Sequence, residues 1–155
     1  MWWRRLRYVL LLVALCAIAT CPTAQRSCTA KTRAREAEQL LAYLADRVEA
    51  AIAATGRVPA VAAGPSPATS CCDQGGTCAA DPATWSAPGW KALAFSIDGE
   101  HRYVYAYVPA ADGLAAVVRA VGDLDCDGEP ALHEVEIRLE ADGPQRRWTR
   151  KDPLE

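Results

Sequence analysis

The chain has few aromatic residues and only two histidines. Aromatic side chains make up 7% of its 155 residues, whereas apolar residues make up 51%. Alanine, leucine and valine therefore supply most of the hydrophobicity, which predicts a thin core that gains from extra cross-links. Neither His101 nor His133 lies near a nucleophile pattern, so we predict that the protein is not an enzyme.

Acidic residues are missing from the start of the chain, and basic residues are scarce in its later part. Residues 1–30 carry four arginines and no acidic residue, while residues 71–143 carry thirteen acidic residues against one lysine and three arginines, a local net charge of −9. Binding to DNA or RNA requires a basic face for the phosphates, so we expect no nucleic-acid partner. An acidic module is better suited to binding a cation.

Charged residues are also absent from Tyr8 to Gln25, directly after a start that contains Arg4, Arg5 and Arg7. Positive charge before an apolar run directs the following segment out of the cytoplasm. As a helix, this uncharged run would be about 27 Å long, close to the ~30 Å hydrocarbon thickness of a bilayer. We therefore predict that residues 1–25 are a hydrophobic membrane anchor or signal segment, which makes the membrane a partner.

Three fates of this segment remain open. It could stay as an uncleaved transmembrane helix, or it could be a lipoprotein signal, because Ile18–Cys21 resembles a lipobox and would leave Cys21 as the lipidation site. It could also be an ordinary cleaved signal peptide, although no good small-x-small site follows. Each fate delivers the remaining chain to an oxidising compartment of the cell envelope.

The later cysteines fit such a compartment. Cys71, Cys72, Cys78 and Cys126 are even in number and follow the export-type segment, which predicts two disulfides with three alternative connectivities. The competing interpretation is a zinc site. Adjacent Cys71 and Cys72 do not match the usual two-residue ligand spacing, and neither histidine falls in a ligand pattern.

Periodicity predicts an α+β fold in which a long N-terminal helix packs on a small antiparallel sheet. Apolar residues between Leu40 and Ile52 recur at three- and four-residue steps, which predicts an amphipathic helix over 26–57 that stops near Gly56. Residues 58–155 form the predicted disulfide-containing sheet domain. Its expected strands are 102–108, 114–121 and 134–140, with a short edge strand at 146–148, and 59–70 and 82–90 are expected to be loops.

An aspartate-rich segment follows the second of these strands. Aspartates at alternate positions, a turn glycine and a glutamate at the twelfth position match the pattern of a calcium loop. The predicted ligands are Asp123, Asp125, Asp127, Glu129 and Glu134. The alternative is a solvated acidic turn between two strands, since the helices that usually flank such a loop are missing.

The order of these segments resembles that of type IV pilins and pseudopilins. The resemblance is carried by Pro22 after an apolar segment, the following polar helix, Gly89–Phe95, the tyrosine-rich strand to Tyr107, and Gly122–Gly128. It implies a long helix on an antiparallel sheet, pilin or secretion-system subunits as partners, and a calcium-bound loop at Asp123, Asp125 and Asp127. The glycine cleavage motif of prepilins is absent, so the chain would be a diverged member.

These observations together predict a non-enzymatic structural or interaction protein of the bacterial cell envelope. It would be anchored in the inner membrane with its folded domain in the periplasm, or it would be extracellular as part of a filament. The alternative is a stand-alone envelope lipoprotein with a small binding domain. Calcium is the candidate cofactor.

Overall fold

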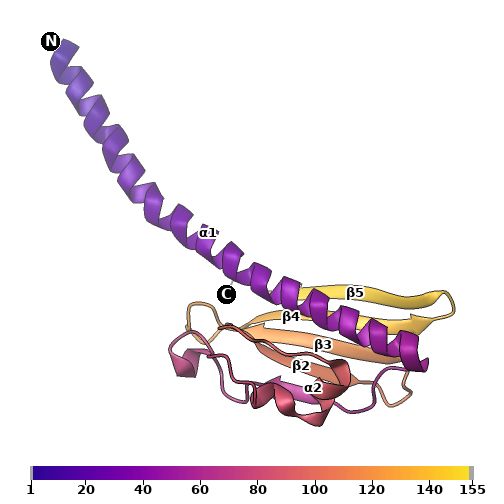
Figure 1. The fold of residues 1–155 in the computed structure, drawn as a ribbon. Helices are drawn as coiled ribbons and strands as arrows, with labels where there is room; N and C mark the ends of the chain where they lie inside the picture. Colours follow the sequence, from indigo (N-terminus) through magenta and orange to yellow (C-terminus); the bar gives the residue numbers. More distant parts are fainter. Residues whose placement is uncertain (1, 154–155) are drawn as a thin grey trace.

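A computed structural model describes the backbone of residues 2–153 and the side chains of Tyr8 and of residues 30–153. The fold is α+β, with one long N-terminal helix and a five-stranded antiparallel sheet (Figure 1). The elements are α1 (Trp2–Thr55), β1 (Ala63–Ser66), α2 (Pro88–Leu93), β2 (Val104–Pro109), β3 (Ala115–Gly122), β4 (Ala131–Glu140) and β5 (Gly143–Lys151), with short 3-10 turns at Cys72–Gln74 and Thr84–Ser86. The expected fold class is confirmed at this level.

The helix α1 runs without interruption through Pro22 and ends as its sequence predicts. Gly56 adopts a positive φ of 72°, a conformation that glycine reaches at little cost. Its N–H donates to the carbonyl of Ile52 at 2.7 Å. Only the second half of α1 lies on the sheet, whereas the first half extends away from the folded domain (Figure 1).

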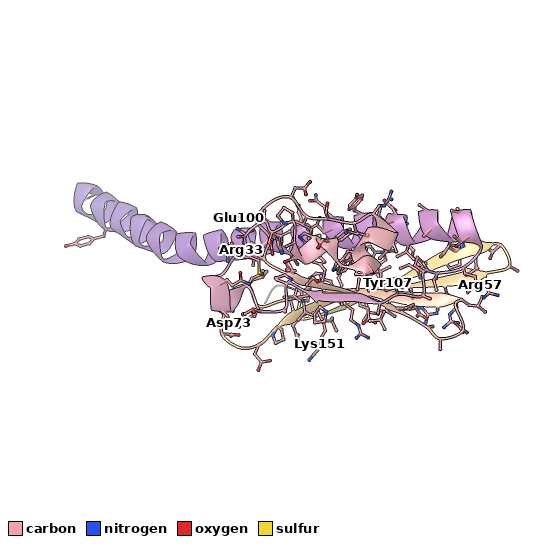
Figure 2. All side chains as sticks on the ribbon, turned by 60° about the horizontal axis from the view of Figure 1, so that its bottom comes forward. Arg33, Arg57, Asp73, Glu100, Tyr107 and Lys151 are labelled. Atoms are coloured by element: carbon pink, nitrogen blue, oxygen red, sulfur yellow. A yellow bond between two sulfur atoms is a disulfide. The ribbon has the colours of Figure 1, made fainter. Side chains whose placement is uncertain are left out.

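The sheet is a meander in the order β1-β2-β3-β4-β5. Successive strands pair antiparallel, with Val104 opposite Val121, Ala120 opposite His133, and Val135 opposite Trp148. Because side chains alternate between the two faces of a strand, this register places Tyr105 on the face that α1 covers. The other face, which carries Lys151, is open to solvent (Figure 2).

The core lies between α1 and the covered face of the sheet. From the helix, Leu41, Leu44 and Val48 are completely buried, as predicted by the apolar stripe. Full burial of such a side chain stabilises a fold by about 1.5–3 kcal/mol. The facing strands contribute the buried residues Tyr103, Tyr105, Tyr107, Ala116, Val118, Ala120, Val135 and Ile137.

Two predicted loops contain regular structure. Residues 63–66 form β1, which pairs with β2 at the edge of the sheet, and residues 88–93 form α2. Pro88 suits the first turn of a helix, and Trp90 of α2 donates its Nε1–H to Ser66 Oγ of β1 at 2.9 Å. This buried hydrogen bond ties the two segments together, and neither has a strong periodic pattern of its own.

Two disulfides close the domain, as the cysteine count predicts. Cys71 is bonded to Cys78 within one loop, and Cys72 is bonded to Cys126, 54 residues away. The second bond joins the segment before α2 to the connection between β3 and β4. Cross-links of this kind stabilise a small domain mainly by restricting its unfolded chain.

One prediction about α1 is wrong. No helix has both the length and the apolar character to cross a membrane within the part of the chain that the structure describes, which contradicts the expected transmembrane helix. Beyond the predicted anchor, the described side chains of α1 include the charged residues Lys31, Arg35 and Glu38. The side chain of Cys21, the predicted lipidation site, lies outside the described residues.

Candidate functional site

The aspartate-rich loop joins β3 to β4 and brings three of its predicted ligands together. The carboxylate oxygens of Asp123, Asp125 and Asp127 offer ligand atoms that lie within 4.8 Å of one another. Asp125 and Asp127 are exposed, whereas Asp123 is half-buried. The loop therefore concentrates three carboxylates at one corner of the sheet.

The Asp123 carboxylate also holds the backbone of the loop. Its Oδ1 accepts the N–H of Cys126 at 2.6 Å and that of Asp127 at 3.2 Å, while its Oδ2 accepts the N–H of Gly128 at 2.8 Å. Aspartate commonly caps turns in this way. The loop is thus closed by hydrogen bonds from its own backbone, and Asp123 has a structural role whether or not a cation binds.

The two predicted glutamate ligands differ in their relation to this cluster: Glu129, expected to offer its backbone carbonyl, adjoins Asp127, whereas the Glu134 carboxylate is not grouped with the three aspartates among the described residues. Glu129 is exposed, and its N–H donates to Asp127 Oδ1 at 2.9 Å. Glu134 lies within β4, where its carboxylate forms an ion pair with Arg119 of β3 at 2.5 Å. The sequence spacing places Glu134 twelfth in the pattern, but the extended backbone of a strand directs it onto the open face of the sheet.

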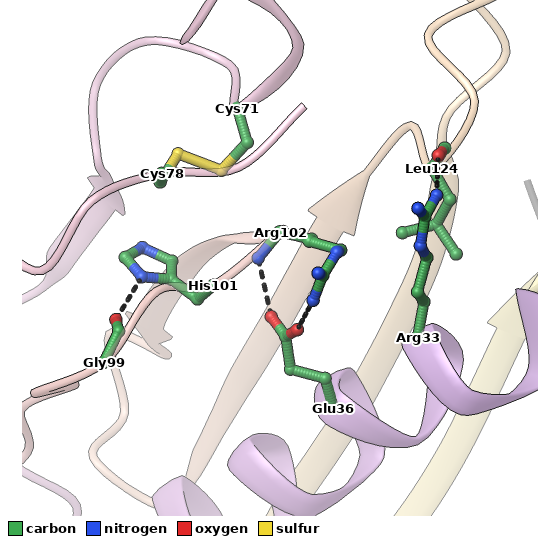
Figure 3. Close-up of polar contacts among 8 residues, drawn as sticks. All are labelled: Arg33, Glu36, Cys71, Cys78, Gly99, His101, Arg102 and Leu124. Carbon is green, nitrogen blue, oxygen red and sulfur yellow. Dashed lines mark hydrogen bonds and ion pairs between the residues drawn. A yellow bond between two sulfur atoms is a disulfide. The ribbon is translucent and has the colours of Figure 1, made fainter. Parts of the chain in front are cut away.

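Two contacts fix the loop to the rest of the domain. The Cys72–Cys126 disulfide holds it from one side. From the other side, Arg33 of α1 donates to the carbonyl of Leu124 at 2.7 Å, and Leu124 is itself buried (Figure 3). The loop is therefore preorganised, which is the condition under which closely spaced carboxylates can bind a cation tightly.

The donor set fits a hard cation only in part. Calcium takes six to eight oxygens, and the loop offers three carboxylates, of which Asp123 already accepts three N–H groups. Water would have to supply the remaining oxygens, which is typical of weak surface sites. Asp125 and Asp127 are both exposed, and because Asp127 accepts only the N–H of Glu129 in the described structure, these two carboxylates keep more oxygen lone pairs for an ion than Asp123 does.

A second cluster was missed by the sequence analysis. Cys71, Cys78 and His101 are all buried, and their sulfur and ring nitrogen atoms lie within 4.8 Å of one another. His101 is 23 positions beyond Cys78 and reaches it through an isolated β-bridge. In that bridge the N–H of Cys78 donates to the carbonyl of His101 at 2.7 Å, and the reciprocal bond is 3.1 Å. No local motif in the sequence marks such a pairing.

The His101 ring is oriented by one hydrogen bond. Its Nδ1 lies 3.2 Å from the carbonyl oxygen of Gly99, and because a carbonyl only accepts, Nδ1 is the protonated nitrogen. Nε2 is then left with a lone pair. This atom is buried without a hydrogen-bond partner among the described residues, and it faces the Cys71–Cys78 disulfide (Figure 3).

An open cavity of about 280 Å³ adjoins this cluster. Its lining includes Cys78 and His101, together with Thr69, Gln74, Asp81 and Trp85. Gln74 Nε2 lies 3.3 Å from Cys78 Sγ, and the Trp85 ring packs against His101 with centroids 5.7 Å apart. Two members of the buried cluster, Cys78 and His101, therefore line an open cavity.

The three tyrosines of the 103–107 segment are packing residues. All three are completely buried. Burial raises the pKa of Tyr107 to about 12, and its hydroxyl donates to the carbonyl of Pro59 at 2.6 Å. Burial also raises the pKa of Tyr105 well above its usual value. The phenols stay neutral at physiological pH and belong to the core between the sheet and α1.

Comparison of the chain with protein-family models, with curated proteins and with solved structures finds no match.

Proposed function

We propose that the protein is a non-enzymatic subunit or accessory factor of a cell-envelope assembly, built like a type IV pilin or pseudopilin. The observation that carries this proposal is the division of α1 into two halves. One half covers the sheet, and the other extends beyond the domain with nothing of the described chain packed on it (Figure 1). A helix without tertiary contacts is only marginally stable in water, so the projecting half requires a partner.

The sequence of the projecting half indicates the kind of partner. The run from Tyr8 to Gln25 carries no charge, and an apolar helix gains stability by packing against other apolar helices. Equivalent helices of further pilin-like or secretion-system subunits would meet this requirement. The globular domain would then be displayed at the outside of the assembly.

The two disulfides support a location on the oxidising side of the envelope. Structural disulfides form and persist in the periplasm or outside the cell. The acidic domain gains stability from the cross-links that such a compartment permits. We therefore infer that the folded domain works in the periplasm, or outside the cell when the assembly is a filament.

Photo-crosslinking from two tyrosine positions tests the assembly role. Tyr8 is exposed in the projecting half of α1, and Tyr43 is exposed in the half that covers the sheet. A photoreactive amino acid at position 8 should give adducts with the helical segment of another copy or another envelope subunit in native cells. The same amino acid at position 43 is the matched control and should give few. Equal labelling from both positions, or no adduct from position 8, would contradict the proposal.

We further propose that calcium stabilises the β3–β4 loop through Asp125 and Asp127, with Asp123 completing the set. Binding to the folded state alone raises stability by mass action. Calcium should therefore raise the melting temperature of the full chain relative to chelator. The double variant Asp125→Asn/Asp127→Asn, which leaves the backbone contacts of Asp123 in place, should abolish the difference. An identical midpoint with calcium and with chelator would show that the loop is only a turn.

A further inference from the structure

We propose that the chain binds one zinc ion through Cys71, Cys78 and His101 when the Cys71–Cys78 bond is open. The disulfide and the zinc site would be two states of the same three side chains. This inference is independent of the assembly role. It concerns the chain before oxidation, or after reduction by a thiol or phosphine.

The donor set is one that zinc prefers. Zinc binds cysteine thiolates at about 2.3 Å and histidine nitrogens at about 2.0–2.1 Å, usually in tetrahedral geometry. The three donor atoms already lie within 4.8 Å of one another. Tetrahedral ligands at those bond lengths are about 3.5–3.8 Å apart, so the sulfurs need only separate by rotation of their side chains once the bond between them is broken.

The orientation of His101 is the second, independent observation. A histidine that binds a metal commonly donates its other ring N–H to a backbone carbonyl, which fixes the ring and the tautomer. His101 has this arrangement, with Nδ1 directed to Gly99 O at 3.2 Å and Nε2 free of any partner in the described structure. The side chain is 2% exposed, and disulfide sulfurs carry no proton that Nε2 could accept. The lone pair therefore faces a position that the oxidised state leaves unsatisfied.

The backbone holds the three ligands in place in either state. The bridge between Cys78 and His101 consists of two backbone hydrogen bonds, and the turn after Cys71 is closed by the N–H of Gly76 at 2.9 Å from the Cys71 carbonyl. None of these contacts involves a sulfur atom. The adjoining cavity, which Cys78 and His101 help to line, leaves a fourth coordination position for water.

The chemistry of the exchange balances with a phosphine as reductant. The Sγ–Sγ bond is cleaved, one water supplies the oxygen that converts the phosphine to its oxide, and the two sulfurs become thiols. Zinc then displaces the two thiol protons to solvent and accepts the lone pair of His101 Nε2. Reoxidation by a disulfide or quinone oxidant would restore the bridge and release the ion.

Cobalt and zinc titration of the reduced full-length chain tests the site. A variant in which Cys16, Cys21, Cys28, Cys72 and Cys126 are replaced by serine leaves only Cys71 and Cys78. Reduced with phosphine under anaerobic conditions, this protein should bind one Co²⁺ with a thiolate-to-metal absorption band that zinc abolishes. Adding His101→Ala should weaken binding by at least about tenfold. Adding His133→Ala is the matched control, since His133 is also buried but is grouped with no cysteine among the described side chains, and it should leave affinity unchanged.

A measurement with both histidines intact covers the case in which a substitution disturbs folding. In the ¹⁵N-histidine spectrum of the same reduced protein, zinc should shift the Nε2 resonance of His101 and leave those of His133 in place. Absence of the cobalt band, equal binding after His101→Ala, or no shift of the His101 resonance would overturn the proposal.

Discussion

At the scale of single residues, the two histidines show how neighbouring side chains decide chemistry that the sequence leaves open. Both are buried, but they have different neighbours. His101 lies beside two sulfurs, whereas His133 of β4 packs edge-on against the ring of Tyr103, with centroids 5.7 Å apart. Burial, with a smaller contribution from Arg150, lowers the pKa of His133 below its ordinary value of 6.5, although Glu38 and the Pro153 carbonyl oppose the shift.

This shift predicts a pH dependence of stability with a definite sign. Because the unfolded chain binds the His133 proton more tightly than the folded chain, acidification through the unfolded pKa favours unfolding. The free energy of unfolding should therefore decrease as the pH falls from about 7.5 to about 5.5. Denaturant titrations of the wild type and His133→Gln across this range measure the effect. The variant should show a shallower decrease, and parallel curves would contradict the assignment.

The predicted ligands of the acidic loop show what residue spacing can and cannot determine. Alternate aspartates in a short turn must lie close together, and Asp123, Asp125 and Asp127 do so. Glu134 fits the same pattern by position alone. Glu134 belongs to β4, whose side chains alternate between the two faces of the sheet. The pairing of β3 with β4 places its carboxylate in an ion pair with Arg119. The cluster at His101 could not be predicted at all, because a tertiary β-bridge creates it.

At the scale of secondary-structure elements, α1 is held on the sheet by arginines as well as by its apolar stripe. Arg146 of β5 contacts Asp46 at 2.6 Å and Glu49 at 2.5 Å. At the other end of the covered half, Glu36 accepts hydrogen bonds from both the backbone N–H and the guanidinium of Arg102 (Figure 3). These contacts orient a helix that apolar packing alone would allow to slide.

The Arg146 contacts should contribute measurably to stability. Arg146→Met keeps the apolar stem of the side chain and removes two charge-assisted contacts, one to the part-buried Glu49 and one to the exposed Asp46, so a loss of about 1–2 kcal/mol is expected. Arg147→Met, on the exposed neighbouring position of β5, should change stability by less than about 0.5 kcal/mol. Chemical denaturation of both variants gives the comparison. Equal losses would mean that the α1 contacts of Arg146 carry no net energy.

The elements with strong periodicity were predictable, and those fixed by tertiary contacts were not. The end of α1 and the strands β2, β3 and β4 follow from apolar spacing, and their bounds differ from the predictions by three residues at most. β5 is much longer than the predicted 146–148, because pairing with β4 extends it to Gly143–Lys151. β1 and α2 are stabilised by the Trp90–Ser66 bond, which joins segments that lie far apart in the sequence.

At the scale of the whole molecule, the chain consists of a folded domain and a helix that projects from it (Figure 1). The buried set of α1 begins at Ala34 within the described side chains, and the first half of the helix extends away from the sheet (Figure 1), so we expect the core to form without the first 29 residues. The proposed assembly role requires such a domain to fold without the projecting half of α1.

Truncation tests this independence. A chain that starts at residue 30 should melt within a few degrees of the full-length protein and keep its near-ultraviolet circular dichroism. A chain that starts at residue 39 loses Ala34, Glu36 and Ala37, including the Arg102 contacts. It should melt several degrees lower. A large loss of stability in the longer fragment would show that the projecting half takes part in the fold.

The central claim is that the protein works as an exported domain braced by two disulfides, and thiol trapping in native cells tests it most directly. Cells are treated with an alkylating reagent before lysis, and the purified chain is mapped by mass spectrometry without reduction. The account predicts that Cys71 is bonded to Cys78 and Cys72 to Cys126, with none of the four alkylated. Recovery of all four cysteines as alkylated thiols would contradict it.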